Sequence, residues 1–173
     1  MTRSGHPHRW ACEMARRDTI LQLVGQLNYV WTNTESLLIY LILHLAQTSK
    51  ETAIVIFLTL NTTRARLELL ERLAKMAATP AETRAQVLEI SGKLKQESRI
   101  RNKYNHCIYS FDADGNFSST QLMRIAEFAD DLKYGKTELL DETEVERLES
   151  AITGIANVNR DIWKFIKEQR IDV

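Results

Sequence analysis

The chain has 173 residues, a length that suits a single domain large enough to bury its own core. Lys and Arg together number 23, as do Asp and Glu, so the formal net charge is zero and excludes a chain-wide attraction to nucleic acid or to an anionic membrane. With only 6 Gly and 2 Pro, and with abundant Leu, Ala, Ile, Glu, Lys and Arg, the composition favours helix over sheet.

The N-terminal segment, residues 1–15, mixes Gly, Pro, His and Arg without hydrophobic periodicity. We therefore expect a loose arm there and one helical domain over residues 16–173. His6, His8 and Cys12 lack the fourth ligand and the paired spacing of a structural zinc site, so no metal is expected. No Gly-rich phosphate loop occurs, and no cofactor is expected. The absence of an apolar signal segment and of a disulfide framework favours a reducing, cytoplasmic location.

A long helix is predicted over residues 16–47, where apolar residues recur at steps of three and four. Residues 37–46 are apolar nearly all round, which indicates a central or interfacial segment, and they are too few for a membrane span of about 20 residues. Glu35 lies at the start of this apolar segment. If it is buried, it is the predicted partner of Arg101, and the alternative is a solvated glutamate on the helix face.

A second helix is predicted over residues 50–77, with a polar interruption at its centre. Arg64 lies on the apolar stripe between Leu60 and Leu67, next to several threonines that form helix poorly. Two outcomes are compatible with this pattern. Arg64 contributes to a polar pocket together with Arg101, or the helix kinks and Arg64 reaches solvent.

The third predicted helix, residues 81–109, has the clearest start in the chain: Thr79 as cap, Pro80 at the first position and Glu82 to complete the capping box. Its second half is the most basic segment of the chain. We expect a phosphate backbone to be held by the cations of this segment and the preceding helix, Lys95, Arg99, Lys103 and Arg64, with a solvated basic face as the alternative.

A short β-hairpin is predicted over residues 107–118, where two runs with apolar and aromatic residues flank a turn that contains Gly. A fourth helix is expected over residues 119–134, capped by Ser118, and a fifth over residues 142–169. The predicted fold is therefore all-α, an up-and-down bundle of about five helices with a short β-hairpin after the third long helix.

The segment from Arg101 to His106 places reactive side chains on the apolar face of the third predicted helix. A buried, unpaired guanidinium costs several kcal/mol or more, so Arg101 must meet a carboxylate, another subunit, a phosphate or water. Residues five apart on a straight helix point about 140° apart and are separated by about 7.5 Å along the axis. Arg101 and His106 therefore do not form one compact site on a single helix, whereas two chains related by a two-fold axis would bring an Arg and a His from both copies to one cleft.

Arg101 and His106, with Asn102 directly after the arginine, resemble the R-x4-H signature of the HEPN superfamily. The resemblance implies a compact helical homodimer, and many such proteins are metal-independent endoribonucleases of toxin–antitoxin, phage-defence or RNA-processing systems. It also implies that His106 is the general base, that Arg101 neutralises charge on the phosphate, and that RNA is the substrate. Asn102 and Asn105 would orient the imidazole or the phosphate, and Tyr104 would stack on a base.

One departure from the family pattern concerns regulation. HEPN toxins that are controlled by a nucleotidyltransferase partner carry a Tyr two positions after the His, whereas position 108 here is Ile and Tyr109 comes one step later. This regulation is therefore not expected, although another antitoxin or protein partner is compatible with the sequence.

The main alternative is a non-catalytic helical dimer that binds a protein or a nucleotide and uses Arg101 as a structural charge. An enzyme requires an accessible His106 beside Arg101, whereas a scaffold would pair Arg101 with Glu35 or another acid and leave His106 facing outward alone. A nucleotide-binding accessory subunit is a third reading, which the lack of a Gly-rich phosphate loop disfavours.

Overall fold

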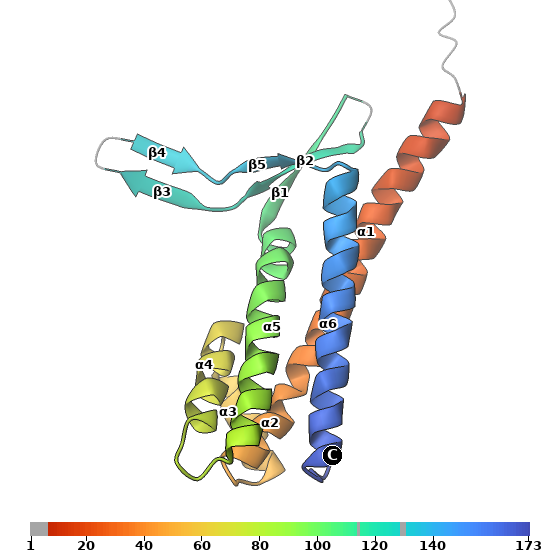
Figure 1. Cartoon of the computed structure of the whole chain (residues 1–173). Coiled ribbons are helices and arrows are strands. Elements are labelled where there is room, and N and C mark those ends of the chain that lie inside the picture. The colour runs from red at the N-terminus through yellow and green to blue at the C-terminus, as the bar shows by residue number, and fades with distance from the viewer. Residues whose placement is uncertain (1–6, 114, 129–130) are drawn as a thin grey trace, which may run out of the picture. The chain divides into compact units, whose positions relative to one another are not determined.

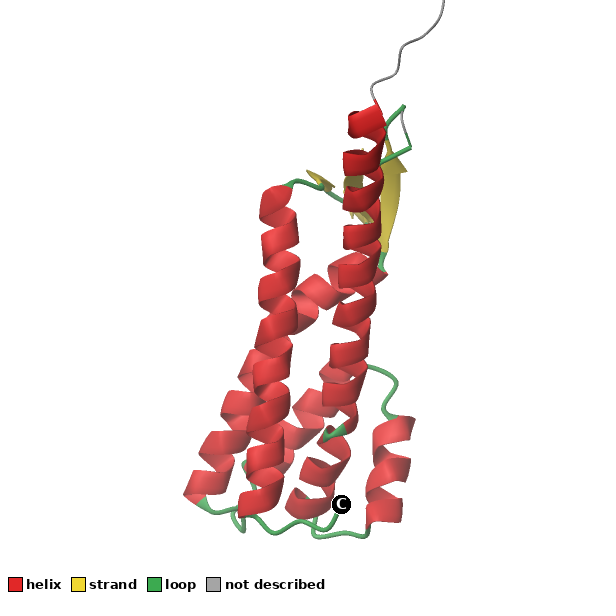
Figure 2. Ribbon diagram, turned by 90° about the vertical axis from the view of Figure 1, so that its right-hand side faces the viewer, coloured by secondary structure: helices red, strands yellow, loops and turns green. Residues whose placement is uncertain are grey.

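The computed structural model describes residues 7–113, 115–128 and 131–173, and most of them are helical (Figures 1 and 2). The helices and strands follow the order α1 (Pro7–Ser36), α2 (Leu38–Leu45), α3 (Lys50–Thr59), α4 (Thr63–Ala74), α5 (Ala81–Asn105), β1 (Cys107–Phe111), β2 (Phe117–Leu122), β3 (Ile125–Phe128), β4 (Asp131–Tyr134), β5 (Thr137–Leu139) and α6 (Glu142–Glu168). The prediction of a mostly helical chain is confirmed.

The contacts within the chain gather into two compact units. The first, which we call the sheet unit, contains the chain up to Leu27 and Ile100–Ser150, and therefore all five strands. The second, the helical unit, contains Asn28–Arg99 and Ala151–Val173.

The helical unit has a core of large aliphatic and aromatic side chains, and α2 packs against α3 and α4. Its most completely buried members include Trp31, Leu38, Leu41, Ile42, Leu67, Leu70, Leu94, Ile155 and Phe165. The nearly continuous apolar character of α2 follows from this central place, as a helix that is apolar on all sides requires neighbours on all sides. No helix in the described part of the chain combines the length and the apolar character that a bilayer span needs.

The predicted helix over residues 50–77 is divided into α3 and α4. Leu60 adopts an extended backbone at the end of α3, and the Thr62 side chain accepts a hydrogen bond from the Ala65 amide at 3.1 Å to cap α4. A threonine that bonds to the backbone in this way favours a helix start over a helix interior. Arg64 is consequently exposed in the first turn of α4, as the kinked alternative predicted.

The sheet unit contains the predicted hairpin, in which β1 and β2 pair antiparallel from Cys107 opposite Leu122 to Phe111 opposite Phe117. Its turn is closed by bonds from the amides of Gly115 and Asn116 to Asp112, with Gly115 at a φ of 84°, a value that glycine adopts readily. Strand β5 joins the other edge of β2, and β3 and β4 form a separate antiparallel pair.

Three predicted boundaries are wrong. The predicted helix over residues 119–134 is instead β2, β3 and β4, so a second strand pair and β5 accompany the hairpin. The strands follow the fifth helix and not the third, because the first two predicted helices are each divided. Residues 7–15 belong to α1 and not to a loose arm, while residues 1–6 lie outside the described residues.

Candidate functional site

The C-terminal end of α5 carries Arg101, Asn102 and His106. The helix ends at Asn105, and the His106 amide still bonds to the Asn102 carbonyl at 3.1 Å. The His106 carbonyl accepts a bond from the Met123 amide at 2.9 Å, so residue 106 joins the helix end to the segment between β2 and β3. The backbone at His106 is therefore fixed from both sides.

The side chains at this helix end differ in their accessibility. His106 and Asn102 are exposed, and Arg101 and Asn105 are half-buried. Arg101 Nη1 donates to Asn102 Oδ1 at 3.0 Å. An exposed imidazole can exchange protons with a bound substrate, and a guanidinium can meet a phosphate.

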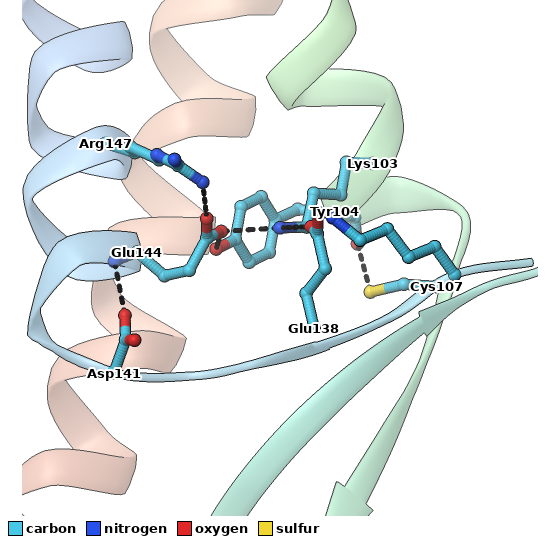
Figure 3. A network of polar contacts seen from close by, with 8 residues as sticks. Lys103, Tyr104, Cys107, Glu138, Asp141, Glu144 and Arg147 are labelled. Atoms are coloured by element: carbon cyan, nitrogen blue, oxygen red, sulfur yellow. Dashed lines mark hydrogen bonds and ion pairs between the residues drawn. The ribbon is translucent and has the colours of Figure 1, made fainter.

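Lys103 and Tyr104 have structural roles that the sequence analysis did not anticipate (Figure 3). The Tyr104 hydroxyl donates to Glu144 Oε2 at 2.9 Å, and only 3% of the residue is exposed. Tyr104 is therefore not available for the predicted stacking on a base. Lys103 Nζ lies 2.5 Å from both Glu138 and Glu144, so its charge is neutralised internally, which disfavours the predicted RNA contact for this residue.

Glu144 is the centre of this polar network, which lies within the sheet unit (Figure 3). Arg147 Nη1 donates to Glu144 Oε1 at 2.5 Å. The Glu144 amide donates to Asp141 Oδ1 at 3.0 Å, and this bond caps α6. Burial raises the pKa of Glu144, but hydrogen bonds from Lys103, Arg147 and Tyr104 outweigh burial and leave the pKa below its ordinary value.

The pKa values of the partners of Glu144 shift for related reasons. Hydrogen bonds from Lys103 and then Lys136 lower the pKa of Glu138 to about 2. Burial lowers the pKa of Lys103, yet its hydrogen bonds to Glu138 and Glu144 reverse the sign and raise the pKa overall. Burial, followed by the bond to Glu144, raises the pKa of Tyr104, which therefore remains a neutral donor. The network is thus a permanent pairing of charges at neutral pH.

Glu35 is buried in the helical unit, and the cation that it meets is Arg66. Its Oε1 lies 3.0 Å from Arg66 Nη1 and accepts a bond from the Thr63 hydroxyl at 2.5 Å, and its Oε2 accepts a bond from Trp31 Nε1 at 3.1 Å. The sequence left open whether Glu35 is solvated or buried, with Arg101 as its predicted partner if buried. Glu35 is buried, and its partner is Arg66 within its own unit.

The remaining cations proposed to hold phosphate lie in the helical unit. Lys95 Nζ is 2.6 Å from Glu71, and Arg64 Nε is 2.7 Å from Glu68. Arg99 is exposed. Because two of these three cations already have acidic partners, the solvated basic face is the better description of this surface.

No group of three or more His, Cys, Asp and Glu side chains within the described residues is arranged to hold a metal ion. His6 and the side chains of His8 and Cys12 lie outside what the structure describes.

Comparisons of the chain with protein-family models, with curated proteins and with solved structures give no match. The functional argument therefore depends on the side chains at the end of α5 and on their surroundings.

Proposed function

We propose that this protein is a metal-independent endoribonuclease of HEPN type, with Arg101 and His106 as its catalytic residues. The observation that supports the proposal is the exposed His106 at the end of α5, five residues after an arginine that bonds to Asn102. A general base must reach the proton that it removes, and an exposed imidazole on a fixed backbone meets this requirement. Arg101 supplies the positive charge that phosphoryl transfer needs.

The reaction that these groups would perform is transfer to the ribose 2′-oxygen. His106 accepts the proton of the 2′-hydroxyl, the 2′-oxygen attacks phosphorus, and the bond from phosphorus to the 5′-oxygen breaks. The leaving 5′-oxygen takes a proton from the imidazole of a second copy of the chain or from water. The products are a 2′,3′-cyclic phosphate and a 5′-hydroxyl. Arg101 neutralises the charge that develops on the phosphate oxygens, and Asn102 and Asn105 orient the reacting groups.

A homodimer is part of the proposal because Arg101 and His106 point in different directions on one helix. Two chains paired about a two-fold axis would bring an arginine and a histidine from both copies to each cleft. The up-and-down bundle, the cytoplasmic location and a toxin–antitoxin or phage-defence role belong to the same proposal. A protein partner such as an antitoxin would regulate the activity.

The test is cleavage of total RNA and of purified tRNA in EDTA by the wild type and by His106→Ala and Arg101→Ala. We expect metal-independent cleavage that both substitutions abolish, with the same dimer by light scattering. Arg72→Ala, which removes an exposed arginine of α4, is the matched control and should cleave at the wild-type rate. A wild type that cleaves neither substrate, or mutants with undiminished cleavage, would reject the nuclease.

The second candidate is a non-catalytic helical dimer that binds a protein or a nucleotide. The internal pairing of Lys103 favours it, because this pairing removes one of the cations expected to contact RNA. Inactivity of the wild type on both RNA substrates would move the assignment to this function.

A further inference from the structure

The sheet unit contains a hollow of about 330 Å³ between its two antiparallel strand pairs. Ile108 of β1 lies directly opposite Gln121 of β2, and Ile125 of β3 lies directly opposite Tyr134 of β4. All four residues line the hollow, together with residues 122–124. The chain passes there from β2 to β3 (Figure 1). The volume is near the lower end of small-ligand sites, roughly 300–1,000 Å³.

The apolar side chains around this hollow are open to solvent. The exposed fraction is 69% for Tyr134 and 60% for Met123, and Ile108 and Ile125 are also more than half exposed. Single apolar residues on a surface need no explanation, but a group of them around a concave site is typical of a binding site.

Close contacts fix the segments that line the hollow and Gly135, which directly follows Tyr134. A Cβ atom at Gly135 would lie only 2.1 Å from the Leu122 carbonyl oxygen, so the close approach of these two segments requires a glycine. Gln121 Nε2 donates to the Gly135 carbonyl at 3.3 Å, and the Arg124 amide donates to the Leu122 carbonyl at 2.8 Å. The site is therefore built before any ligand arrives, which lowers the entropic cost of binding.

The hollow adjoins the proposed catalytic histidine. Met123, which lines it, donates its amide to the His106 carbonyl at 2.9 Å, and Ile108 follows His106 by two residues. Arg124 also lines the hollow, and its side chain is exposed. An aromatic ring, apolar walls, a polar amide and a cation thus line a hollow that is joined through the main chain to His106, the proposed general base.

We propose that this hollow is a subsite for one unpaired base of single-stranded RNA, an inference that depends on the proposed function. Tyr134 stacks on the base, the aliphatic side chains cover its edges, and Arg124 meets a neighbouring phosphate. A protein partner would also cover apolar side chains, but the small volume, the cation in the lining and the contact with His106 favour a nucleotide. Paired bases are stacked inside a duplex, so the subsite selects single strands and loops.

The experiment is binding of a short fluorescein-labelled RNA single strand with all four bases, measured by anisotropy in the His106→Ala protein, so that cleavage cannot interfere. Tyr134→Ala should weaken binding roughly tenfold, in line with the loss of one base–aromatic stack, while Tyr134→Phe, which keeps the ring, should bind as well as the parent. Arg124→Ala should reduce the slope of log affinity against log salt by about one. The same strand in a duplex should bind without dependence on Tyr134.

Tyr29→Ala is the matched control, because Tyr29 is 71% exposed and lies in the helical unit, outside the lining of the hollow. It should leave the affinity unchanged. Circular dichroism and thermal melting of each variant exclude loss of the fold as the cause of weaker binding.

The outcomes separate this inference from the nuclease. Equal affinity of Tyr134→Ala and its parent would overturn the subsite, and so would a change of oligomeric state in Tyr134→Ala, which would assign the surface to a protein contact. If cleavage requires His106 but the affinity for RNA does not depend on Tyr134, the subsite is rejected and the nuclease is kept. Binding that requires Tyr134 in a chain that never cleaves RNA rejects the nuclease and keeps the subsite.

Discussion

Among the residues whose burial the structure describes, each of the two units buries one carboxylate, and the two are held differently. Glu35 in the helical unit meets Arg66, Thr63 and Trp31, all contributed by helices α1 and α4. Glu144 in the sheet unit meets Lys103, Tyr104 and Arg147, and it shares Lys103 with Glu138 of β5. A buried charge is tolerated only when it is paired and fully hydrogen-bonded, and both carboxylates satisfy that condition.

The comparison shows which charged groups are structural. The buried carboxylates pair with Arg66 and Lys103, among others. Lys103 was itself expected to contact RNA, and Arg66 lies two residues from Arg64, another of the expected cations. Lys103 follows Asn102 directly in the sequence, yet the two side chains differ: Asn102 is exposed, whereas Lys103 is paired and largely covered. Proximity in sequence to the motif is therefore no guide to function here, whereas accessibility separates His106 from Tyr104.

The largest effect is expected when either carboxylate is removed. Glu144→Ala removes the acceptor of the Tyr104 hydroxyl and one of the two carboxylates that pair with Lys103. Glu35→Ala removes the acceptor of the Thr63 hydroxyl and the carboxylate that pairs with Arg66. Each change should lower the free energy of unfolding by about 3–5 kcal/mol, measured by urea denaturation. Glu149→Ala, an exposed position on α6, is the control and should stay within about 0.5 kcal/mol. Losses near zero in both mutants would contradict a structural role for the two carboxylates.

The next prediction concerns the stability of the chain at low pH. The pKa of Glu138 is about 2 in the folded chain, against an ordinary value of 4.5, so the folded state favours the ionised form. The contribution of Glu138 to the free energy of unfolding is present above pH 4.5 and is lost as the pH falls toward 2. After allowance for solvent screening, we expect the free energy of unfolding to fall by about 1–2 kcal/mol over this pH range. Glu138→Gln should remove this part of the pH dependence, and a mutant with the same acid profile as the wild type would contradict it.

The sequence predicted the elements whose signals are local. Thr79 and Pro80 placed the start of α5, and the regular apolar spacing placed α6, because caps and periodicity depend on neighbours within a few residues. The prediction of a helix over residues 119–134 was wrong because the signal that decides is not local. The apolar residues of this segment at Leu122, Ile125 and Leu132 fit helical spacing, and the pairing of β2 with β1 and β5, and of β3 with β4, decides for strands.

In the candidate site, too, features set by neighbouring residues were predictable and features set by distant residues were not. The helix that carries Arg101 was predicted from its apolar spacing, although α5 ends at Asn105 and not at residue 109. The burial of Tyr104 was not predicted, since its partner Glu144 lies 40 residues further along the chain. The one local signal was the pair Asp141 and Glu144 before an apolar stripe, which is the pattern of a capping box and says nothing of Lys103.

Replacing one glycine in each unit by alanine should change the stability of the chain in opposite directions. Gly135 in the sheet unit has no room for a Cβ, so Gly135→Ala should shift the backbone and destabilise the chain by about 1–3 kcal/mol. A Cβ added at Gly92, in α5 of the helical unit, would meet nothing within 4 Å, and Gly92→Ala should stabilise the chain by about 0.5–1 kcal/mol. Thermal melting measures both. Shifts of the same sign would refute the close approach of Gly135 to Leu122.

The smallest effect tests why the helical unit contains two short helices where one long helix was predicted. The Thr62 side chain accepts a hydrogen bond from the Ala65 amide at 3.1 Å, so Thr62→Ala should lower the free energy of unfolding by about 1 kcal/mol through loss of the cap. Thr32→Ala, at an exposed position inside α1, is the control and should be neutral or slightly stabilising, because alanine forms helix better than threonine. If Thr62→Ala were as stable as the wild type, the break between α3 and α4 would have to arise from the extended backbone at Leu60 and from core packing instead of from the cap.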